Sequence, residues 1–447
     1  MKRPLAMYER AMYLNGGFHV NVMVTARIRG YIAEQRMQQA LARVQAKHSV
    51  LRCLIVQECN RPGFVMQDRP TPIPLRITQR RNDDDWVEVS MHESLQRFDG
   101  SRQPLARLIW LRGEAESELL LVCSHAICDG RSLLTLLHEI LLLCDRPDAD
   151  IGSPTSLNAI EEIFPARLWA DRGLQRRIRW KAAVVKLLLR FARSGPGWTY
   201  GKIYRSLWTL DEQTSQLLVA RCKAEGVNLF AALSAASMLA FRAVCGGRHL
   251  EKFEAPVDIR RFLPDLRTDS LFAIAPTIIL SLGKLRGVDP VTSDFWTLAR
   301  ALKTDMDRKI DGLDSTVYEN FLGMEHMHDA YDRMVVYAQS KRAGQQVSLS
   351  YVGKVDLAQH YRDFRLQEIC DISAMMAPTP ANLIVIYSFA GQFHFSLASD
   401  ESSLPYAQAL QIKEQVTATL LACLTKVETP AAISAGASLA RAKVRLS

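Results

Sequence analysis

The chain has 447 residues, of which 48% are hydrophobic and 23% are charged, and these fractions are ordinary for a globular protein. The length predicts two domains of about 200 residues each. The formal net charge of +9 favours acidic partners, but no zinc-finger spacing, helix-turn-helix pattern or RNA-binding aromatic signature accompanies it. We therefore expect no nucleic acid partner, and the lack of glycine-rich phosphate-binding motifs argues against a bound dinucleotide or nucleoside triphosphate.

The ends of the chain and its cysteines bear on the compartment. Met1–Arg10 lacks the apolar core of a secretory signal, and the apolar stretch Leu229–Phe241 is too short to span a bilayer. Nine cysteines occur without any CxxC spacing, which favours reduced thiols. We expect a cytoplasmic monomer that binds no metal and no cofactor.

The first predicted elements alternate between strand and helix. His19–Gly30 is rich in valine with an alternating pattern, which predicts a strand. Ala33–Lys47 has apolar residues at helical spacing, and a short connection leads from there into a further strand that ends near Val56. This order indicates an α/β or α+β domain.

The most informative segment follows the next predicted strand, Glu118–Ser124, a short continuous apolar run. The run ends at His125, and Asp129 and Gly130 follow before a helical pattern at Ser132–Cys144. An imidazole at a strand end can take a proton near neutral pH, although a histidine in this position can also be purely structural. The acid can share the loop and either hold its shape or orient the ring.

Two cysteines flank this histidine. Cys123 lies inside the apolar strand and Cys128 lies in the loop, so a nucleophilic thiol is one hypothesis. A cysteine within an apolar strand behaves as a small core residue, and we favour that interpretation.

The segment Arg172–Arg193 carries eight Lys or Arg residues and no acid. Ser194–Gly197 then predicts its end, so we expect a basic amphipathic helix followed by a linker. Such a helix can rest on the fold with its charges in water, or it can contact a lipid surface or an acidic carrier protein. Its predicted apolar stripe consists of Leu174, Ile178, Ala182, Val185 and Leu189.

The second half begins near Tyr200 and again alternates helices with strands. Asn228 predicts the N-cap of a helix from Leu229 to about Val244. The tail after Pro430 is rich in Ala, Ser and basic residues, and we expect it to be disordered. Strands are predicted at Ala275–Leu282, Val347–Val352, Leu383–Phe389 and Gln392–Ala398, the last two joined as a hairpin through Ala390-Gly391.

Four separated segments carry a family resemblance: Val20–Ile55, His125-x-x-x-Asp129-Gly130, Val257–Arg260 and Ser350–Val355. In their order and spacing they resemble the chloramphenicol-acetyltransferase-like superfamily over residues 5 to 425. That superfamily includes condensation domains of nonribosomal peptide synthetases, plant BAHD acyltransferases, wax ester synthases and mycobacterial polyketide-associated acyltransferases. In this resemblance Val257–Arg260 corresponds to a strand motif of the second half.

The resemblance implies an α/β fold of two chloramphenicol-acetyltransferase-like subdomains, each a mixed sheet flanked by helices. They would meet at a V-shaped cleft crossed by a central tunnel, with the motif histidine at its middle. We predict an N-terminal subdomain at 1–170, a basic crossover helix and linker at 171–199, a C-terminal subdomain at 200–430 and a disordered tail at 431–447.

The implied activity is acyl transfer from a coenzyme A or phosphopantetheinyl carrier-protein thioester to a hydroxyl acceptor, in polyketide, lipid or other secondary-metabolite biosynthesis. His125 would be the general base, and the amide of Gly130 would stabilise the oxyanion. Ser350 is a second candidate donor, although it can also be structural, and Gly353 lines the same late segment.

Asp129 would pair with an arginine and shape the loop rather than move protons. Arg260 is the first choice for this partner because it occupies the matching motif, and Arg52 is the second, although Arg260 can also be a solvated charge. Ser124 departs from the pattern, because many family members have a second histidine at that position. This departure weakens the peptide-synthetase interpretation more than the ester-forming one.

Three functional hypotheses remain open from the sequence. The leading one is a stand-alone acyltransferase that makes an ester and acts in trans, because the sequence carries no recognisable adenylation or carrier domain. The second is a free-standing condensation enzyme that makes an amide, and the third is a binding module that kept the fold without turnover. The acyl chain and the acceptor are not specified by the sequence.

Overall fold

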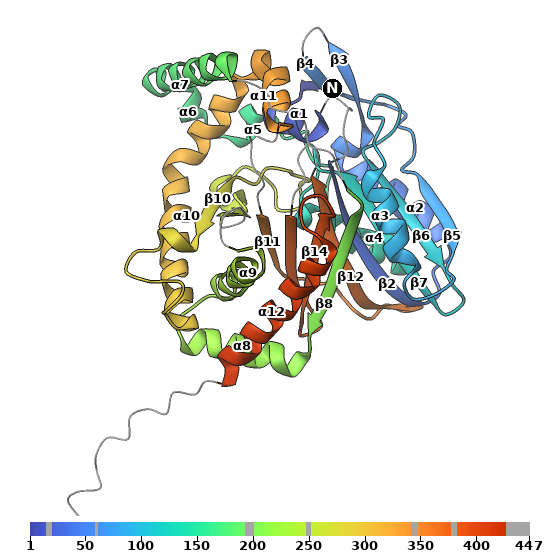
Figure 1. Cartoon of the computed structure of the whole chain (residues 1–447). Helices are drawn as coiled ribbons and strands as arrows, with labels where there is room; N and C mark the ends of the chain where they lie inside the picture. Colours follow the sequence, from blue (N-terminus) through green and yellow to red (C-terminus); the bar gives the residue numbers. More distant parts are fainter. Residues whose placement is uncertain are drawn as a thin grey trace, which may run out of the picture.

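Two mixed β-sheets form the centre of the computed structural model, which describes residues 1–14, 20–58, 61–192, 201–246, 252–340, 347–376 and 382–425 (Figure 1). The first sheet has the strand order β12-β2-β7-β6-β5 and the second the order β10-β9-β11-β13-β14-β8, while a small third sheet has the order β1-β4-β3. The strands are β1 Lys2–Pro4, β2 Val20–Gly30, β3 Cys53–Glu58, β4 Arg61–Met66, β5 Leu75–Gln79, β6 Ala106–Arg112, β7 Glu116–Ser124, β8 Ile203–Leu210, β9 Lys252–Pro256, β10 Thr277–Ser281, β11 Val347–Lys354, β12 Phe364–Met376, β13 Asn382–Phe389 and β14 Gln392–Asp400.

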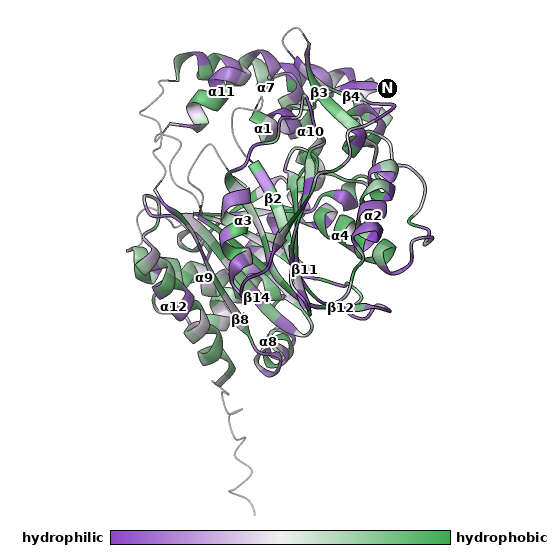
Figure 2. Ribbon diagram, turned by 90° about the vertical axis from the view of Figure 1, so that its right-hand side faces the viewer, coloured by the Kyte–Doolittle hydropathy of each residue, from purple (hydrophilic) through white to green (hydrophobic). Residues whose placement is uncertain are grey.

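Helices flank both large sheets (Figures 1 and 2). On the first sheet α2 and α4 pack against each other and contribute to one hydrophobic core with β2 and β7, while α3 also contacts β2 and β7. On the second sheet α9 and α12 pack together over a separate core. The helices are α1 Met7–Tyr13, α2 Glu34–Lys47, α3 Asp85–Leu95, α4 Gly130–Asp145, α5 Ile160–Ile163, α6 Ala166–Ala170, α7 Arg172–Phe191, α8 Glu212–Ala224, α9 Leu229–Cys245, α10 Phe295–Glu325, α11 Tyr331–Ala338 and α12 Tyr406–Thr425.

The elements with a clear hydrophobic period form where the sequence predicts them. β7 contains the predicted strand Glu118–Ser124, and its residues Leu119–Cys123 are fully buried between β2 and β6. The predicted hairpin is confirmed in β13 and β14, which pair antiparallel through a turn at Ala390 and Gly391. Both turn residues have positive φ, at 48° and 82°, the left-handed conformation that two-residue hairpin turns favour.

The predicted helix cap in the second half is also confirmed. The side-chain oxygen of Asn228 accepts a hydrogen bond from the amide of Ala231 at 2.8 Å, so it satisfies one of the free amides at the start of α9. The helix ends at Cys245 and Gly246 follows with φ of 74°, which satisfies the left-handed backbone at its C-terminus.

β12 was not predicted, although it ties the two halves together. It lies within the residues assigned to the second half, yet it pairs antiparallel with the whole of β2 in the first sheet, from Phe364 opposite Gly30 to Met376 opposite Val20. Two register shifts interrupt β12, between Leu366 and Glu368 and near Cys370. Each bulge changes the side to which later residues point, so the strand shows no continuous alternation in the sequence.

A buried ion pair also crosses between the sheets. Arg205 of β8, in the second sheet, donates to Asp371 of β12 at 2.7 Å, and the side chains are 3% and 0% exposed. The guanidinium also donates to the hydroxyls of Ser90 and Ser94 on α3, at 3.0 and 2.6 Å. A buried guanidinium needs such partners, because burial alone lowers its pKa. The pair therefore fixes how β8 lies against β12 and α3.

Some predictions lie outside the described residues or are not tested by the fold. The linker predicted at Ser194–Gly197 and the tail predicted at 431–447 fall outside the described residues. The subdomain boundaries stay predictions. Within the described ranges no single helix has both the length and the apolar composition to cross a membrane, while α8 and α9, bent by 107°, pass that test only as a pair.

We predict that Arg205→Leu lowers the free energy of unfolding by about 3–5 kcal/mol, because it leaves Asp371 buried without its cation. Denaturant unfolding measures this change. Arg36→Leu is the matched control, because Arg36 pairs with Asp363 at the surface, where an ion pair contributes only about 0–1 kcal/mol. The double variant Arg205→Leu/Asp371→Leu should recover much of the loss, and no recovery would mean that the pair is not the source of the effect.

Candidate active site

The loop that carries His125 begins where β7 stops pairing. The amide of Ser124 donates to the carbonyl of Leu105 and the amide of His125 donates to the carbonyl of Val20, so the strand ends in backbone hydrogen bonds to its neighbours. The amide of Ile127 then bonds back to Ser124, which turns the chain before α4 begins at Gly130. The histidine is thus held at the end of a buried strand on a short, well-bonded loop.

The protonation state of the His125 ring depends on its burial. Its side chain is partly exposed, and Nδ1 is buried without a hydrogen-bond partner. Burial lowers the pKa of His125 below 6.5, and the carboxylate of Asp129 offsets this only in part. The imidazole is therefore neutral at physiological pH, the state in which it can accept a proton.

The carboxylate of Asp129 makes no hydrogen bond to the ring. Its Oδ1 accepts from the amide of Ser132 at 2.8 Å and so caps α4. Its two oxygens also accept a forked pair of bonds from Arg260, at 2.7 and 3.0 Å. Asp129 therefore fixes the start of the helix and the shape of the loop in one contact.

Arg260 reaches this loop from the second half of the chain, so the site is assembled across the two halves. Besides Asp129, its guanidinium donates to the hydroxyl of Ser132 at 2.9 Å and lies over the ring of Phe272. The Ser132 hydroxyl in turn donates to the carbonyl of Phe272 at 3.0 Å, and the amide of Asp129 donates to the same carbonyl at 2.9 Å. Although burial by itself disfavours the cation, Asp129 raises the pKa of Arg260 above its ordinary value.

The resemblance to a strand motif at Val257–Arg260 is wrong in one respect. β9 ends at Pro256, and Arg260 begins a short 3-10 turn, Arg260–Phe262. The reason is local, because the side chain of Asp258 accepts a hydrogen bond from the amide of Arg260 at 3.0 Å and turns the backbone out of the strand. The turn directs Arg260 toward α4 instead of leaving it on a sheet face.

The alternative partner, Arg52, does not reach the loop. It lies at the end of a 3-10 turn before β3 and donates to the carbonyl of Gln67 at 3.3 Å. His48, four residues earlier, is buried and bonded through Nε2 to Glu139 of α4 at 2.8 Å. His48 therefore braces α4, while the side chain of Arg52 bonds to the segment that follows β4.

The structure bears differently on the three remaining predicted site residues, Gly130, Ser350 and Gly353. Gly130 is the first residue of α4, where backbone amides have no acceptor within the helix, and a Cβ added to it would lie 3.8 Å from Val352 of β11. The start of α4 therefore lies close to β11. Gly353 sits at a bulge of β11 with φ of 86°, which favours glycine there. Ser350, on the same strand, pairs with Val385, and its assignment as an oxyanion donor stays a prediction.

The remaining polar groups near the loop are structural. Ser124 is buried, and its hydroxyl accepts from the amide of Ala126 at 3.4 Å. Cys123 and Cys128 are both fully buried, and burial raises the pKa of the Cys128 thiol well above its ordinary value. Neither thiol is placed as a nucleophile. Among the described residues no group of three or more His, Cys, Asp or Glu side chains could hold a metal ion.

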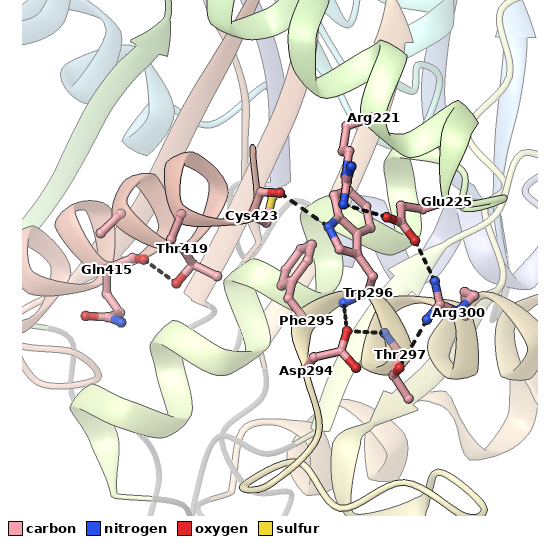
Figure 3. A pocket seen from close by; sticks show the side chains of 12 residues that line it. Arg221, Glu225, Asp294, Phe295, Trp296, Thr297, Arg300, Gln415, Thr419 and Cys423 are labelled. Carbon is pink, nitrogen blue, oxygen red and sulfur yellow. Dashed lines mark hydrogen bonds and ion pairs between the residues drawn. The ribbon is translucent and has the colours of Figure 1, made fainter. Parts of the chain in front are cut away.

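A separate pocket of about 550 Å³ lies between α8, the start of α10 and α12 (Figure 3). Its charged groups satisfy one another, because Glu225 pairs with Arg221 at 2.8 Å and with Arg300 at 2.7 Å. The indole of Trp296 donates to the carbonyl of Cys423 at 3.3 Å. The pocket shares no residue with the His125 loop or with the residues bonded to it.

The family model described as Condensation domain matches residues 6–161, which is less than half of the chain and includes the His125 loop. No curated protein sequence matches the chain. The similarity of this fold to solved structures therefore carries most of the comparison.

Three solved structures illustrate that similarity. Trichothecene 15-O-acetyltransferase from Fusarium sporotrichioides superposes with a TM-score of 0.69 at 11% identity, covering 94% of this chain and 95% of that one. Polyketide synthase associated protein 5 from Mycobacterium tuberculosis gives 0.61 at 17%, covering 94% and 98%. A nonribosomal peptide synthetase cyclization-docking bidomain from Sorangium cellulosum gives 0.64 at 14%, covering 96% and 85%. The predicted fold class is confirmed, and the family match bears out the predicted resemblance over residues 6–161, while the V-shaped cleft and the central tunnel stay predictions.

We predict that Asp129→Ala lowers the free energy of unfolding by about 3 kcal/mol or more, because it removes a helix cap and leaves Arg260 without its carboxylate. Thermal and denaturant unfolding measure the change. Asp211→Ala is the control, because Asp211 caps α8 at 2.8 Å without a buried ion pair and should cost only about 1 kcal/mol. An Asp129→Ala protein with unchanged stability but lost activity would instead assign Asp129 a direct catalytic role.

Proposed function

The chain has the fold of the condensation-domain acyltransferases, and from this premise we propose that it transfers an acyl group from a thioester to a hydroxyl acceptor, with His125 as the general base. The observation that carries this proposal is a neutral imidazole on a partly exposed residue, whose Nδ1 has no side-chain or backbone hydrogen-bond partner among the described residues. It lies on a loop held from both halves of the chain.

The proposed reaction needs one proton carrier and a fixed geometry. As the acceptor oxygen attacks the thioester carbonyl carbon, His125 removes the hydroxyl proton, and a tetrahedral oxyanion forms. The amide of Gly130 is the proposed donor to that oxygen, with Ser350 as a second candidate. When the carbon–sulfur bond breaks, the imidazolium returns the proton to the leaving thiolate, so no acyl-enzyme and no cofactor are needed.

The comparisons support ester formation by analogy, since one similar structure is described as a 15-O-acetyltransferase. They also include peptide-synthetase domains, so amide formation is the second candidate. Ser124, in place of the second histidine common in the family, favours the ester. Supplying one acyl thioester with an alcohol and an amine of matched chain length separates the two, and we expect faster turnover with the alcohol.

The donor is proposed to be an acyl thioester of coenzyme A or of a phosphopantetheinyl carrier protein, and the pathway to be natural-product biosynthesis. The net charge of +9 suits either donor, because both carry phosphate or acidic groups. Comparing acyl-coenzyme A with the same acyl group on a carrier protein identifies the preferred donor. If the protein transfers no acyl group from any of these donors to any acceptor, it is instead a binding module.

We predict that His125→Ala lowers kcat by about 10²–10⁴-fold while the fold is retained, because general-base catalysis typically contributes that factor. Single-turnover acyl transfer measures the rate, and circular dichroism checks the fold. His138→Ala on α4 is the matched control, because His138 is exposed and should leave kcat unchanged. Retention of more than roughly a tenth of the wild-type rate would refute the general-base assignment.

The pH profile provides a second test. A general base works in its neutral form, and the pKa of His125 is lowered by burial below 6.5. We therefore predict that log kcat/KM is level above neutral pH and falls at lower pH, with a midpoint below 6.5, as the imidazole becomes protonated. An acidic limb with its midpoint above 6.5 would contradict the assignment.

A further inference from the structure

Helix α7 has one face on the protein and a second apolar face directed away from it. The inner face is buried, because Leu174 and Ile178 pack in a core with α10 residues, and Ala182 packs in a small core with α11. This is the stripe that the sequence predicts, although Val185 near its end is largely exposed. The helix is therefore anchored along its first three turns.

The outer face carries large apolar side chains that contact little of the protein. Trp180, Leu187 and Phe191 recur at spacings of seven and four residues, which places them on one side of a helix. They are 67%, 56% and 75% exposed, and the adjacent Leu188 is 66% exposed. In both ribbon views α7 lies at the outer edge of the molecule (Figures 1 and 2). Contiguous exposed apolar residues of this size indicate an interaction surface.

Cations border this apolar face. Arg177 and Lys181 pair with Glu319 of α10, and Lys186 pairs with Asp329, so part of the charge is used within the fold. Arg176, Arg179 and Arg190 have no ion pair among the described residues and are exposed. Their guanidinium groups are available to an external anion.

The local field is positive enough to act on a neighbouring group. Partial burial lowers the pKa of His326, and repulsion from Arg179 and Lys186 lowers it further. On the neighbouring helix α11, Val336 is also 50% exposed. A groove of about 340 Å³ between the two helices is lined by Leu189, Arg190, Ala192, Asp332, Arg333, Val336 and Tyr337.

We propose that the outer face of α7, defined by Trp180, Leu187, Leu188 and Phe191, docks on an anionic lipid bilayer surface. A helix with a row of Trp, Leu and Phe bordered by arginines has the composition of a helix that lies in a membrane interface, with the apolar side chains in the headgroup region and the cations on anionic lipids. A purely solvated basic face would not present these apolar residues. This surface is independent of the proposed acyl transfer.

The test is flotation of the full chain with vesicles of phosphatidylcholine alone or with about a third phosphatidylglycerol. We expect binding to the anionic vesicles that weakens as salt rises. The variants Arg176→Glu/Arg179→Glu/Arg190→Glu and Leu187→Gln/Leu188→Gln/Phe191→Gln should each lower the partition coefficient by at least about tenfold, because each removes one of the two contributions.

Matched controls separate this face from general charge and apolarity. The charge control is Arg69→Glu/Lys223→Glu/Arg286→Glu, and the apolar control is Leu217→Gln/Val219→Gln/Leu421→Gln, all at exposed positions on other surfaces. Both should bind vesicles like the wild type, and so should His125→Ala, whose loss of transfer tests the proposed function separately. Equal loss in the controls, or wild-type protein that does not bind anionic vesicles, would overturn the proposal.

Two further measurements use Trp180 fluorescence and an acidic carrier protein as the alternative partner. Trp180 should shift its fluorescence to shorter wavelength on anionic vesicles, and Trp180→Phe should bind while losing that shift. The rival is an acidic carrier protein. If vesicles do not bind but the charge-reversal variant raises the KM for a carrier-loaded donor and not for a small uncharged thioester, the surface docks a carrier protein and the bilayer proposal is wrong.

Discussion

A carboxylate–guanidinium pair that crosses between the two halves of the molecule holds the loop that carries His125. Asp129 caps α4 and accepts a forked pair of hydrogen bonds from Arg260, so one side chain fixes a helix start, a loop and the docking of the second half. The shape of the candidate site therefore depends on the closure of the two halves. Any change in that closure alters the environment of His125 without a change in the residue itself.

A second carboxylate–guanidinium pair, Arg205 with Asp371, lies at the boundary of the two sheets. Arg205 and Asp371 are more deeply buried than Arg260 and Asp129, and they bind β8 to β12 where the second sheet contacts the first. Buried pairs of this kind add little net stability compared with apolar packing, but an unpaired buried charge is costly. They therefore penalise every arrangement of the two sheets other than the native one.

The proton affinity of His125 follows from this arrangement. Burial lowers the pKa of the His125 ring, while the nearby Asp129 carboxylate is bonded to Arg260 and to the start of α4 and makes no hydrogen bond to the ring. A free carboxylate in contact with the ring would raise the pKa of His125 further. Burial therefore leaves the ring neutral, while the structural ion pair keeps the Asp129 carboxylate bonded elsewhere.

The sequence by itself determined the elements whose period is regular: β7 up to His125, α4 after Gly130, the Asn228 cap and the hairpin at Ala390-Gly391. These features depend on near neighbours, so a short window contains their cause. Only the tertiary structure decided that Arg260, 131 residues from Asp129, and not Arg52 pairs with it. It alone added β12, whose bulges hide its period, and exposed the outer face of α7. The Arg260–Asp129 pair, the pairing of β12 and the exposure of α7 all depend on which distant segments come into contact. A short window of sequence does not contain the cause of such contacts.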